Sequence, residues 1–102
     1  MRFIVTGRMI DQAVAPPDQE IAILKATFQF FAENRDPRIK DIYPHADERA
    51  TTLVIDVDTA DELTEILGSI PASRLSTFQS HPVTTPETVL KLLAGWEKMI
   101  QS

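Results

Sequence analysis

The segment ERATTLVIDVDTADELTEILGSIP, residues 48–71, constrains the fold most, because it predicts a strand that runs directly into a helix. Its aliphatic residues between Leu53 and Val57 alternate at the period of a strand with one apolar face. Thr59 and Glu62 follow at the spacing of a capping box, which satisfies backbone donors at a helix N-terminus. The apolar strand face is therefore expected under helices, and the mixed opposite face is expected to form a cleft floor or a dimer seam.

The remaining apolar patterns extend this unit to the order strand, helix, strand, strand, helix, strand, helix. Right-handed crossovers convert the order into an α+β, ferredoxin-like βαββαβ antiparallel sheet with helices on one face and an added C-terminal helix. A chain of 102 residues supports one core, so residues 1–102 are predicted to form a single domain. The other predicted strands are 2–9, 39–45 and 74–83, and strand 39–45 is expected at a sheet edge because it contains Pro44. The other predicted helices are 17–34 and one that begins at Pro86, and the longest predicted loop is 10–16.

Composition excludes several classes of function. The net charge of −5 opposes binding to nucleic acid, which depends on clustered Lys and Arg. The absence of cysteine excludes disulfides, thiolate metal sites and a cysteine nucleophile. No apolar run approaches the roughly 20 residues that span a bilayer, so no membrane partner is expected and the cytoplasm is the expected location.

The C-terminal helix carries an apolar stripe that includes Val89, Leu92, Leu93 and Trp96 at helical spacing. Burying such side chains is worth about 1.5 to 3 kcal/mol each, so the stripe is expected to pack on its own domain or on that of a partner. A domain of this size buries only roughly two thirds of its unfolded surface, a margin that a second subunit widens. A homodimer or higher homo-oligomer is therefore expected.

Candidate catalytic residues gather where strand 39–45 ends. Histidine is the usual acid–base side chain at neutral pH, and His45 stands beside Tyr43 and Glu48, so a histidine–carboxylate pair there is expected to provide the acid and the base that a proton transfer needs. The simpler interpretation of the same residues is a solvated hairpin tip.

Candidate ligand-binding residues are predicted on the mixed sheet face. Arg8, Thr6 and Asp56 share this face, and His81 stands near the end of strand 74–83. Arg8 suits a bidentate contact with a carboxylate and is expected to be freer than Arg2, which approaches Asp56 if their strands pair antiparallel. A strand-end salt bridge is the alternative interpretation. Two histidines without ligand spacing predict no metal, and no cofactor is expected.

The segments ADERATTLVIDVDTADELTEILGSIP and MRFIVTGRM resemble the dimeric α/β-barrel superfamily and, within it, proteins similar to muconolactone isomerase. This resemblance implies a homodimer with a cleft for a small molecule, and an isomerase-like activity on a small organic acid or lactone. It supplies no active-site residue. The alternatives are a cofactor-independent monooxygenase of the same fold and a non-catalytic binding or assembly module.

Overall fold

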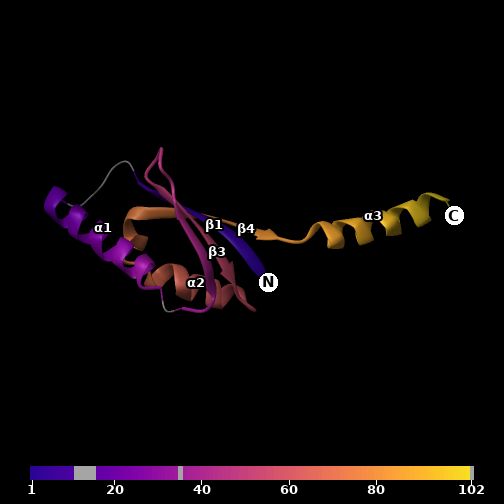
Figure 1. Cartoon of the computed structure of the whole chain (residues 1–102), viewed down its shortest axis with the longest axis horizontal. Helices are drawn as coiled ribbons and strands as arrows, with labels where there is room; N and C mark the ends of the chain where they lie inside the picture. The colour runs from indigo at the N-terminus through magenta and orange to yellow at the C-terminus, as the bar shows by residue number, and fades with distance from the viewer. Residues whose placement is uncertain (11–15, 35, 102) are drawn as a thin grey trace.

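The computed structural model describes residues 1–10, 16–34 and 36–101 (Figure 1). Its elements follow the predicted α+β order, with one 3-10 helix added. They are β1 (Arg2–Met9), α1 (Pro17–Ala32), β2 (Ile39–Pro44), β3 (Ala50–Asp56), α2 (Ala60–Ser69), the 3-10 helix η1 (Pro71–Leu75), β4 (Ser76–Val83) and α3 (Pro86–Gln101). Most of the predicted loop 10–16 lies outside the described residues.

Three predicted element boundaries differ from the structure, and the first is strand β2, which ends at Pro44 instead of 45. Helix α1 ends at Ala32 instead of Asn34: the Glu33 backbone N–H still donates to the Gln29 carbonyl, but the Asn34 backbone N–H donates to the Phe31 carbonyl in a tighter turn. Strand β4 begins at Ser76 instead of 74, because η1 occupies the first residues after Pro71. The Ser76 hydroxyl donates to the Ala72 carbonyl at 2.9 Å, which holds the 3-10 turn against the strand.

The four strands form one antiparallel sheet in the order β2-β3-β1-β4, so β2 is an edge strand as predicted. Proline has no backbone N–H to donate, and it is tolerated there because one side of an edge strand has no neighbouring strand that needs this donor. The register places Arg2 opposite Asp56, Val5 opposite Leu53, and Gly7 opposite both Thr51 and Phe78. A register shift between Ile39 and Asp41 interrupts the β2–β3 ladder.

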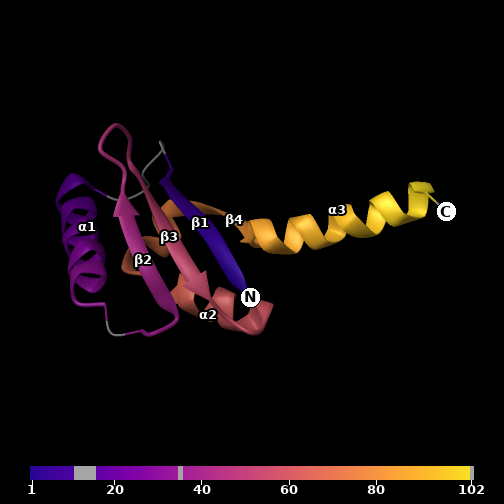
Figure 2. The same ribbon diagram turned by 45° about the vertical axis from the view of Figure 1, so that its right-hand side comes forward.

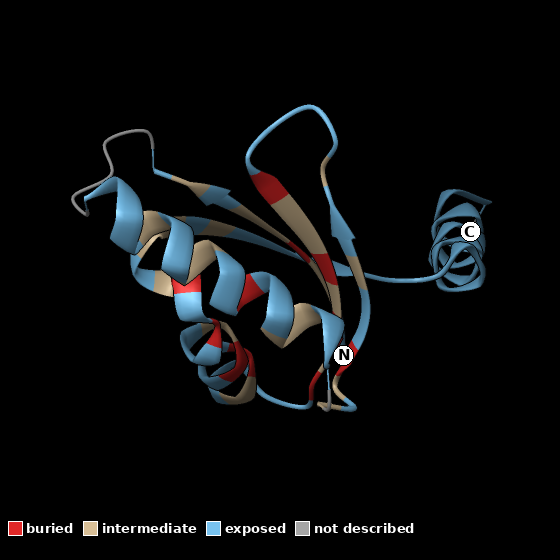
Figure 3. Cartoon of the chain, turned by 60° about the vertical axis from the view of Figure 1, so that its left-hand side comes forward, coloured by how far each residue is buried: buried red, intermediate tan, exposed pale blue. Residues whose placement is uncertain are grey.

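The hydrophobic core lies between the sheet and the two helices α1 and α2. Leu53, Ile55, Ile66 and Val5 are its largest fully buried side chains. Figure 3 shows buried positions, in red, on both the strands and the helices that cover them. They come from β1, β3 and α2, and Phe30 and Phe31 of α1 pack against the same cluster. The predicted dry face of β3 is therefore confirmed, and both helices lie on that side of the sheet (Figure 2).

We call the opposite side of the sheet the open face. The strand alternation and register place these residues on it: Arg2, Ile4, Thr6, Arg8, Asp41, Tyr43, Thr52, Val54, Asp56, Thr77, Gln79, His81 and Val83.

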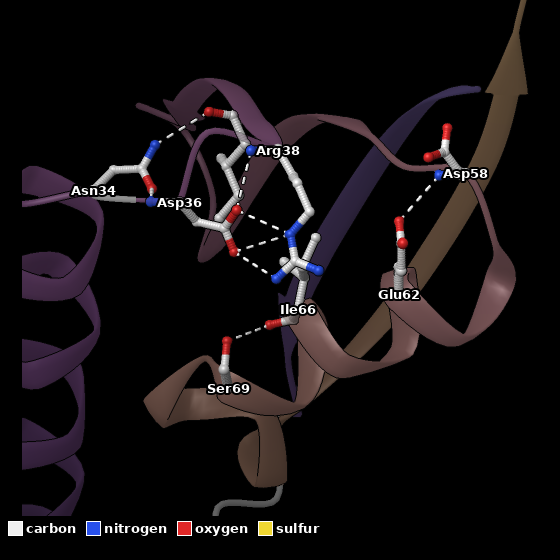
Figure 4. A network of polar contacts seen from close by, with 8 residues as sticks. Asn34, Asp36, Arg38, Asp58, Glu62, Ile66 and Ser69 are labelled. Carbon is white, nitrogen blue, oxygen red and sulfur yellow. Dashed lines mark hydrogen bonds and ion pairs between the residues drawn. The ribbon is translucent and has the colours of Figure 1, made fainter.

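The strand-to-helix boundary before α2 has a capping box displaced by one residue. The Thr59 hydroxyl oxygen accepts from the Glu62 backbone N–H at 3.2 Å, as predicted. The Glu62 carboxylate accepts in return from the Asp58 backbone N–H at 3.0 Å, one residue before the cap (Figure 4). Backbone donors at this helix start are thus satisfied by side chains, and the chain turns sharply from β3 into α2.

Side chains also fix the connection that leads into β2. Asn34 accepts from the Asp36 backbone N–H at 3.1 Å and donates to the Ile39 carbonyl at 3.1 Å (Figure 4). The Asp36 carboxylate accepts from the Arg38 guanidinium at 2.8 Å, and this hydrogen bond is the main reason that the pKa of Asp36 is lowered.

Helix α3 stands apart from the rest of the fold (Figure 1). It has no buried residue. The radius of gyration is 17.9 Å, whereas a compact domain of about 100 residues has roughly 13 Å. The molecule measures 66 × 28 × 25 Å, and the long dimension includes α3. The apolar stripe therefore does not pack on its own domain, and the other expected position, on the domain of a partner, stays a prediction. In the described ranges, no helix is long and apolar enough to cross a membrane.

Candidate functional site

A cavity of about 270 Å³ lies between the sheet and α1, close to the β2–β3 hairpin. Its apolar wall is formed by side chains from β1, α1, β4 and the link between α2 and η1: Met9, Leu24, Phe28, Phe31, Ile70 and Phe78. His45, Glu48 and Arg49 of the hairpin also line it, together with Thr27, Thr51 and Ser76. Such a mostly apolar hollow with a few polar groups at one end is typical of a small-molecule site.

Gly7 shapes this cavity by leaving room for an aromatic ring. A Cβ at position 7 would stand 2.9 Å from Cε1 and 3.1 Å from Cδ1 of Phe78, which is opposite Gly7 in the sheet register. Gly7 does not have a positive φ. Glycine is therefore required here by the lack of space beside Phe78, and not by its backbone conformation. The Phe78 ring can therefore lie across β1 and form part of the cavity wall.

The α1 wall is held by a satisfied polar group and by aromatic contacts. Thr27 is buried, and its hydroxyl donates to the Ile23 carbonyl at 2.8 Å, so it introduces no unpaired donor into the wall. Phe31 makes edge contacts with Phe28 and Phe30, at centroid distances of 6.1 and 5.8 Å. These contacts keep the rings in fixed positions beside the cavity.

His45 and Glu48 form the polar end of the cavity. The tight hairpin brings them together, because the His45 backbone N–H donates to the Ala50 carbonyl at 2.9 Å. His45 Nδ1 lies 2.9 Å from Glu48 Oε1, and His45 Nε2 lies 2.6 Å from the Thr52 hydroxyl oxygen. Arg8 donates to the same Glu48 oxygen at 3.3 Å. Four side chains from β1, the hairpin and β3 thus form one hydrogen-bonded chain.

The charges in this chain fix the direction of its hydrogen bonds. Hydrogen bonding to His45 and, after it, the charge of Arg8 lower the pKa of Glu48, so its carboxylate is ionised at neutral pH. An ionised carboxylate can only accept, so we assign the proton of neutral His45 to Nδ1. Nε2 then holds the lone pair and accepts from the Thr52 hydroxyl. This is the arrangement of a carboxylate that orients an imidazole base.

The structure places two of the three predicted catalytic residues in the cavity lining. His45 and Glu48 both line the cavity, whereas Tyr43 points to the open face opposite Thr52 and is 57% exposed. The catalytic role of all three stays a prediction. Thr52 is a contact of His45 that the sequence interpretation missed as a site residue, because it had placed Thr52 only on the mixed face of β3.

The four predicted ligand-binding residues lie on the open face, away from the cavity lining. Arg2 binds Asp56 through two contacts of 2.8 and 2.9 Å, as the strand pairing predicts. Arg8, which is expected to be freer than Arg2, makes one contact of 3.3 Å with Glu48 of the hairpin, as in the alternative interpretation of a strand-end salt bridge. Thr6 stands opposite Thr52 and Gln79, and His81 stands opposite Ile4. A ligand role for this face stays a prediction.

The cavity lies on the helix side of the sheet, where the sequence interpretation expected ordinary core. The missed residues are Gly7, Thr27, Phe28, Phe31 and Phe78. A glycine inside a strand is the one sequence signal that marks a close approach of this kind. The aromatic residues of α1 have the spacing of a packed helix face, which gives no sign of a hollow beneath them.

Three hairpin side chains also stand at metal-binding distances. His45, Asp47 and Glu48 offer ligand atoms that lie within 4.8 Å of one another. Arg8 already binds Glu48, and both ring nitrogens of His45 have hydrogen-bond partners. A cation would have to break these contacts and tolerate a nearby guanidinium, so the donor set fits an ion-paired network better than a metal centre.

Comparisons with known proteins support the fold. No family model matches the sequence, and no curated protein matches it either. Among solved structures, a crystal structure of muconolactone isomerase matches with a TM-score of 0.70 at 16% sequence identity. The match covers 84% of this chain and 92% of that chain. The chain therefore has the ferredoxin-like α+β fold of muconolactone isomerase.

Proposed function

We propose that this protein binds a small organic acid or lactone in the helix-side cavity and isomerises it by moving a proton, in the manner of a muconolactone isomerase-like enzyme. One observation carries the proposal: a carboxylate-oriented histidine stands at the polar end of an apolar cavity. The pair lies at 2.9 Å, and His45 and Glu48 are both part of the lining. The shared fold with an isomerase agrees with this reaction class.

The chemistry needs a base that takes a proton from one carbon and returns it to another. With its proton on Nδ1, His45 presents the Nε2 lone pair as the base, and Glu48 stabilises the imidazolium that forms. Nε2 contacts Thr52, so the substrate must either displace that hydroxyl or exchange its proton through it. The same imidazolium then donates the proton to the second carbon, so atoms and charge balance over the cycle.

The cavity also favours a particular kind of substrate. Its wall is mostly apolar, so it accepts a hydrocarbon or lactone ring. Arg49 stands in the lining near its hairpin end and forms an ion pair with Glu20 and a contact with the Met9 sulfur. A substrate carboxylate could replace Glu20 as its partner. A volume of about 270 Å³ suits a small molecule and excludes a polymer.

The experiment measures proton exchange with muconolactone as the probe. In D₂O, the wild-type protein should catalyse both isomerisation, followed by ultraviolet absorbance, and deuterium incorporation at the reacting carbons, followed by NMR. His45→Gln should lower both rates by about 10²- to 10⁴-fold, the usual contribution of a general base. Glu48→Gln should lower them less, because it removes only the orienting carboxylate.

Asp47→Asn is the matched control, because Asp47 is adjacent and exposed but does not line the cavity. It should retain the wild-type rates. Oxygen uptake with a phenolic substrate would instead favour the monooxygenase alternative. Binding of muconolactone without exchange, equal in wild type and His45→Gln, would favour a non-catalytic binding module and contradict the proposal.

A further inference from the structure

Arg49 supplies the positive charge of the helix-side cavity. Among the described residues that line this cavity, Glu48 and Arg49 are the ones that carry a full charge at neutral pH. Glu48 already accepts from Arg8 and contacts His45, so its charge is balanced within its own network. Arg49 is therefore the group of the lining that an anionic ligand would meet.

Arg49 holds its carboxylate partner differently from the arginines that fix the strand ends and turns. The Arg2 guanidinium binds its partner through both Nε and Nη2, and so does the Arg38 guanidinium. Arg49 binds Glu20 through Nη2 alone, and within the described ranges its Nε donates to no acceptor. The planar edge of Arg49, which fits a carboxylate through two parallel hydrogen bonds, is thus only half used.

The backbone of Arg49 is fixed, whereas its side chain is free to turn. The Arg49 carbonyl accepts from the Met9 backbone N–H at 3.1 Å, which holds this residue beside β1. The Arg49 side chain is 60% exposed, and its contact besides Glu20 is the Met9 sulfur at 3.5 Å. An ion pair with so exposed a member contributes little to stability, so the guanidinium exchanges partners at small cost.

Glu20 is placed both to hold this guanidinium and to release it. Its side chain is only 18% exposed, so the ion pair keeps the Arg49 guanidinium against α1, where Arg49 lines the cavity. Glu20 lies in the first turn of α1, whose N-terminus is the positive end of the helix dipole. The dipole compensates part of the Glu20 charge when Arg49 turns away. Glu20 itself is not part of the lining, so it does not obstruct a ligand that displaces it.

We propose that Arg49 binds the carboxylate of the ligand, and that Glu20 occupies the Arg49 guanidinium in the ligand-free protein. The ligand carboxylate replaces Glu20 and accepts from both Nε and Nη2, so two parallel hydrogen bonds take the place of one. This inference rests on the proposed function, because it takes the helix-side cavity as the ligand site. It adds the class of ligand: an anionic lactone or ring acid, in preference to a neutral lactone or ester.

The position of Arg49 also fixes which part of the ligand carries the carboxylate. Arg49 and His45 belong to the same hairpin and stand at the same end of the cavity. The carboxylate and the carbon that exchanges its proton with His45 are therefore in the same part of the ligand. The remaining ring lies along the apolar wall beside Phe28 and Phe31.

The first test compares two ligands that differ only in charge. A saturated five-membered lactone with a carboxymethyl group has no double bond to shift, so it cannot be isomerised, and its methyl ester is the neutral counterpart. Calorimetric titration of the wild-type protein should give about 10- to 100-fold tighter binding of the acid, the gain expected from hydrogen bonds between charged groups. Arg49→Met should bind both ligands equally. Arg49→Lys keeps the charge without the planar fork and should retain part of the preference.

The second test removes the internal carboxylate. Glu20→Gln should raise the affinity for the acid by about 3- to 10-fold and leave that for the ester unchanged, because occupation of Arg49 by Glu20 lowers the apparent affinity. If the ion pair only supported the fold, both ligands would bind less tightly. Arg74→Met is the control for the loss of a positive charge, because Arg74 is exposed and lies outside the cavity lining. It should keep the wild-type preference for the acid.

Equal binding of acid and ester by the wild-type protein, a preference that survives Arg49→Met, or no binding of either ligand would overturn the inference. Weaker binding of the acid by Glu20→Gln would overturn it as well. Deuterium exchange with muconolactone tests the proposed isomerisation separately. An Arg49-dependent preference in a protein that exchanges no deuterium would uphold the carboxylate site and contradict the isomerase. Isomerisation without a preference for the acid would do the opposite.

Discussion

Helix α2, which belongs to the packed unit from β1 to β4, and the C-terminal helix α3 have similar sequence patterns and opposite environments. Both α2 and α3 are amphipathic helices with acidic first turns. Leu63 and Ile66 of α2 are buried in the core, whereas no residue of α3 is buried. Periodicity therefore shows which side of a helix needs a partner, and does not show where that partner is. The following experiments contrast the two regions.

The largest expected effect is the loss of a core side chain. Ile66→Ala removes a fully buried side chain of the core cluster and should lower the free energy of unfolding by about 2 to 5 kcal/mol. Urea unfolding should show this loss at every protein concentration. Leu92→Ala on α3 is the comparison. Its effect on the free energy of unfolding should vary with protein concentration, because α3 is expected to pack on a partner. If the effect does not vary, α3 is stabilised within one chain and the contrast between the two regions fails.

The second experiment fills the space beside Phe78. Gly7→Ala places a methyl group 2.9 Å from the ring, so the ring must move toward the cavity. Overpacking of this kind lowers stability by about 1 to 3 kcal/mol. Calorimetric titration should also show weaker ligand binding. Gly95→Ala on α3 is the matched control, because the added methyl group meets nothing there and should raise helicity. Unchanged binding in Gly7→Ala would place the ligand elsewhere.

The third experiment compares two helix caps. Thr59→Ala removes the hydroxyl that accepts from Glu62 at 3.2 Å and should lower the free energy of unfolding by about 1 kcal/mol. Thr85 accepts from the Thr88 backbone N–H at the same distance at the start of α3. Thr85→Ala should fray α3 and reduce circular dichroism at 222 nm, with little change in the urea midpoint of the domain. If Thr59→Ala and Thr85→Ala lower the urea midpoint equally, α3 unfolds together with the domain.

The smallest expected effect is the acid sensitivity of the Asp36–Arg38 pair. The hydrogen bond from Arg38 lowers the pKa of Asp36 in the folded protein, so folding favours the ionised carboxylate. Its contribution is present above the unfolded value, about 4, and is lost as the pH falls through the folded value. Asp36→Asn should therefore be less stable than wild type at pH 7, and the difference should shrink in acid. If the difference in stability between wild type and Asp36→Asn does not change with pH, the substitution removes only hydrogen bonds and the charge of Asp36 makes no contribution.

Much of the fold was predictable because local patterns decide it. The strand alternation of β1 and β3, the cap at Thr59 and the edge position forced by Pro44 follow from side-chain chemistry over a few residues. The pairing of Arg2 with Asp56 followed from antiparallel register. The 3-10 turn before β4 was missed, because a short turn after Pro71 has almost the same local signals as the start of a strand.

The candidate site was predictable only in part. His45 and Glu48 are three residues apart, so a tight hairpin brings them together without any distant contact. Their partners Arg8 and Thr52 come from neighbouring strands, and the contact between Arg8 and Glu48 depends on how far the hairpin leans over β1. The cavity depends on the gap between α1 and the sheet, which no single element specifies.

By itself, the sequence determined the elements, their order, the dry face of β3 and the need of α3 for a partner surface. These follow from short-range periodicity, capping and proline chemistry, which act within one or two turns of the chain. Only the tertiary structure decided that a cavity opens beside Gly7 and Phe78, that Glu48 binds Arg8, and that α3 leaves its own domain. Those outcomes depend on the packing distance between elements far apart in the sequence, and packing distance is set by all their side chains together.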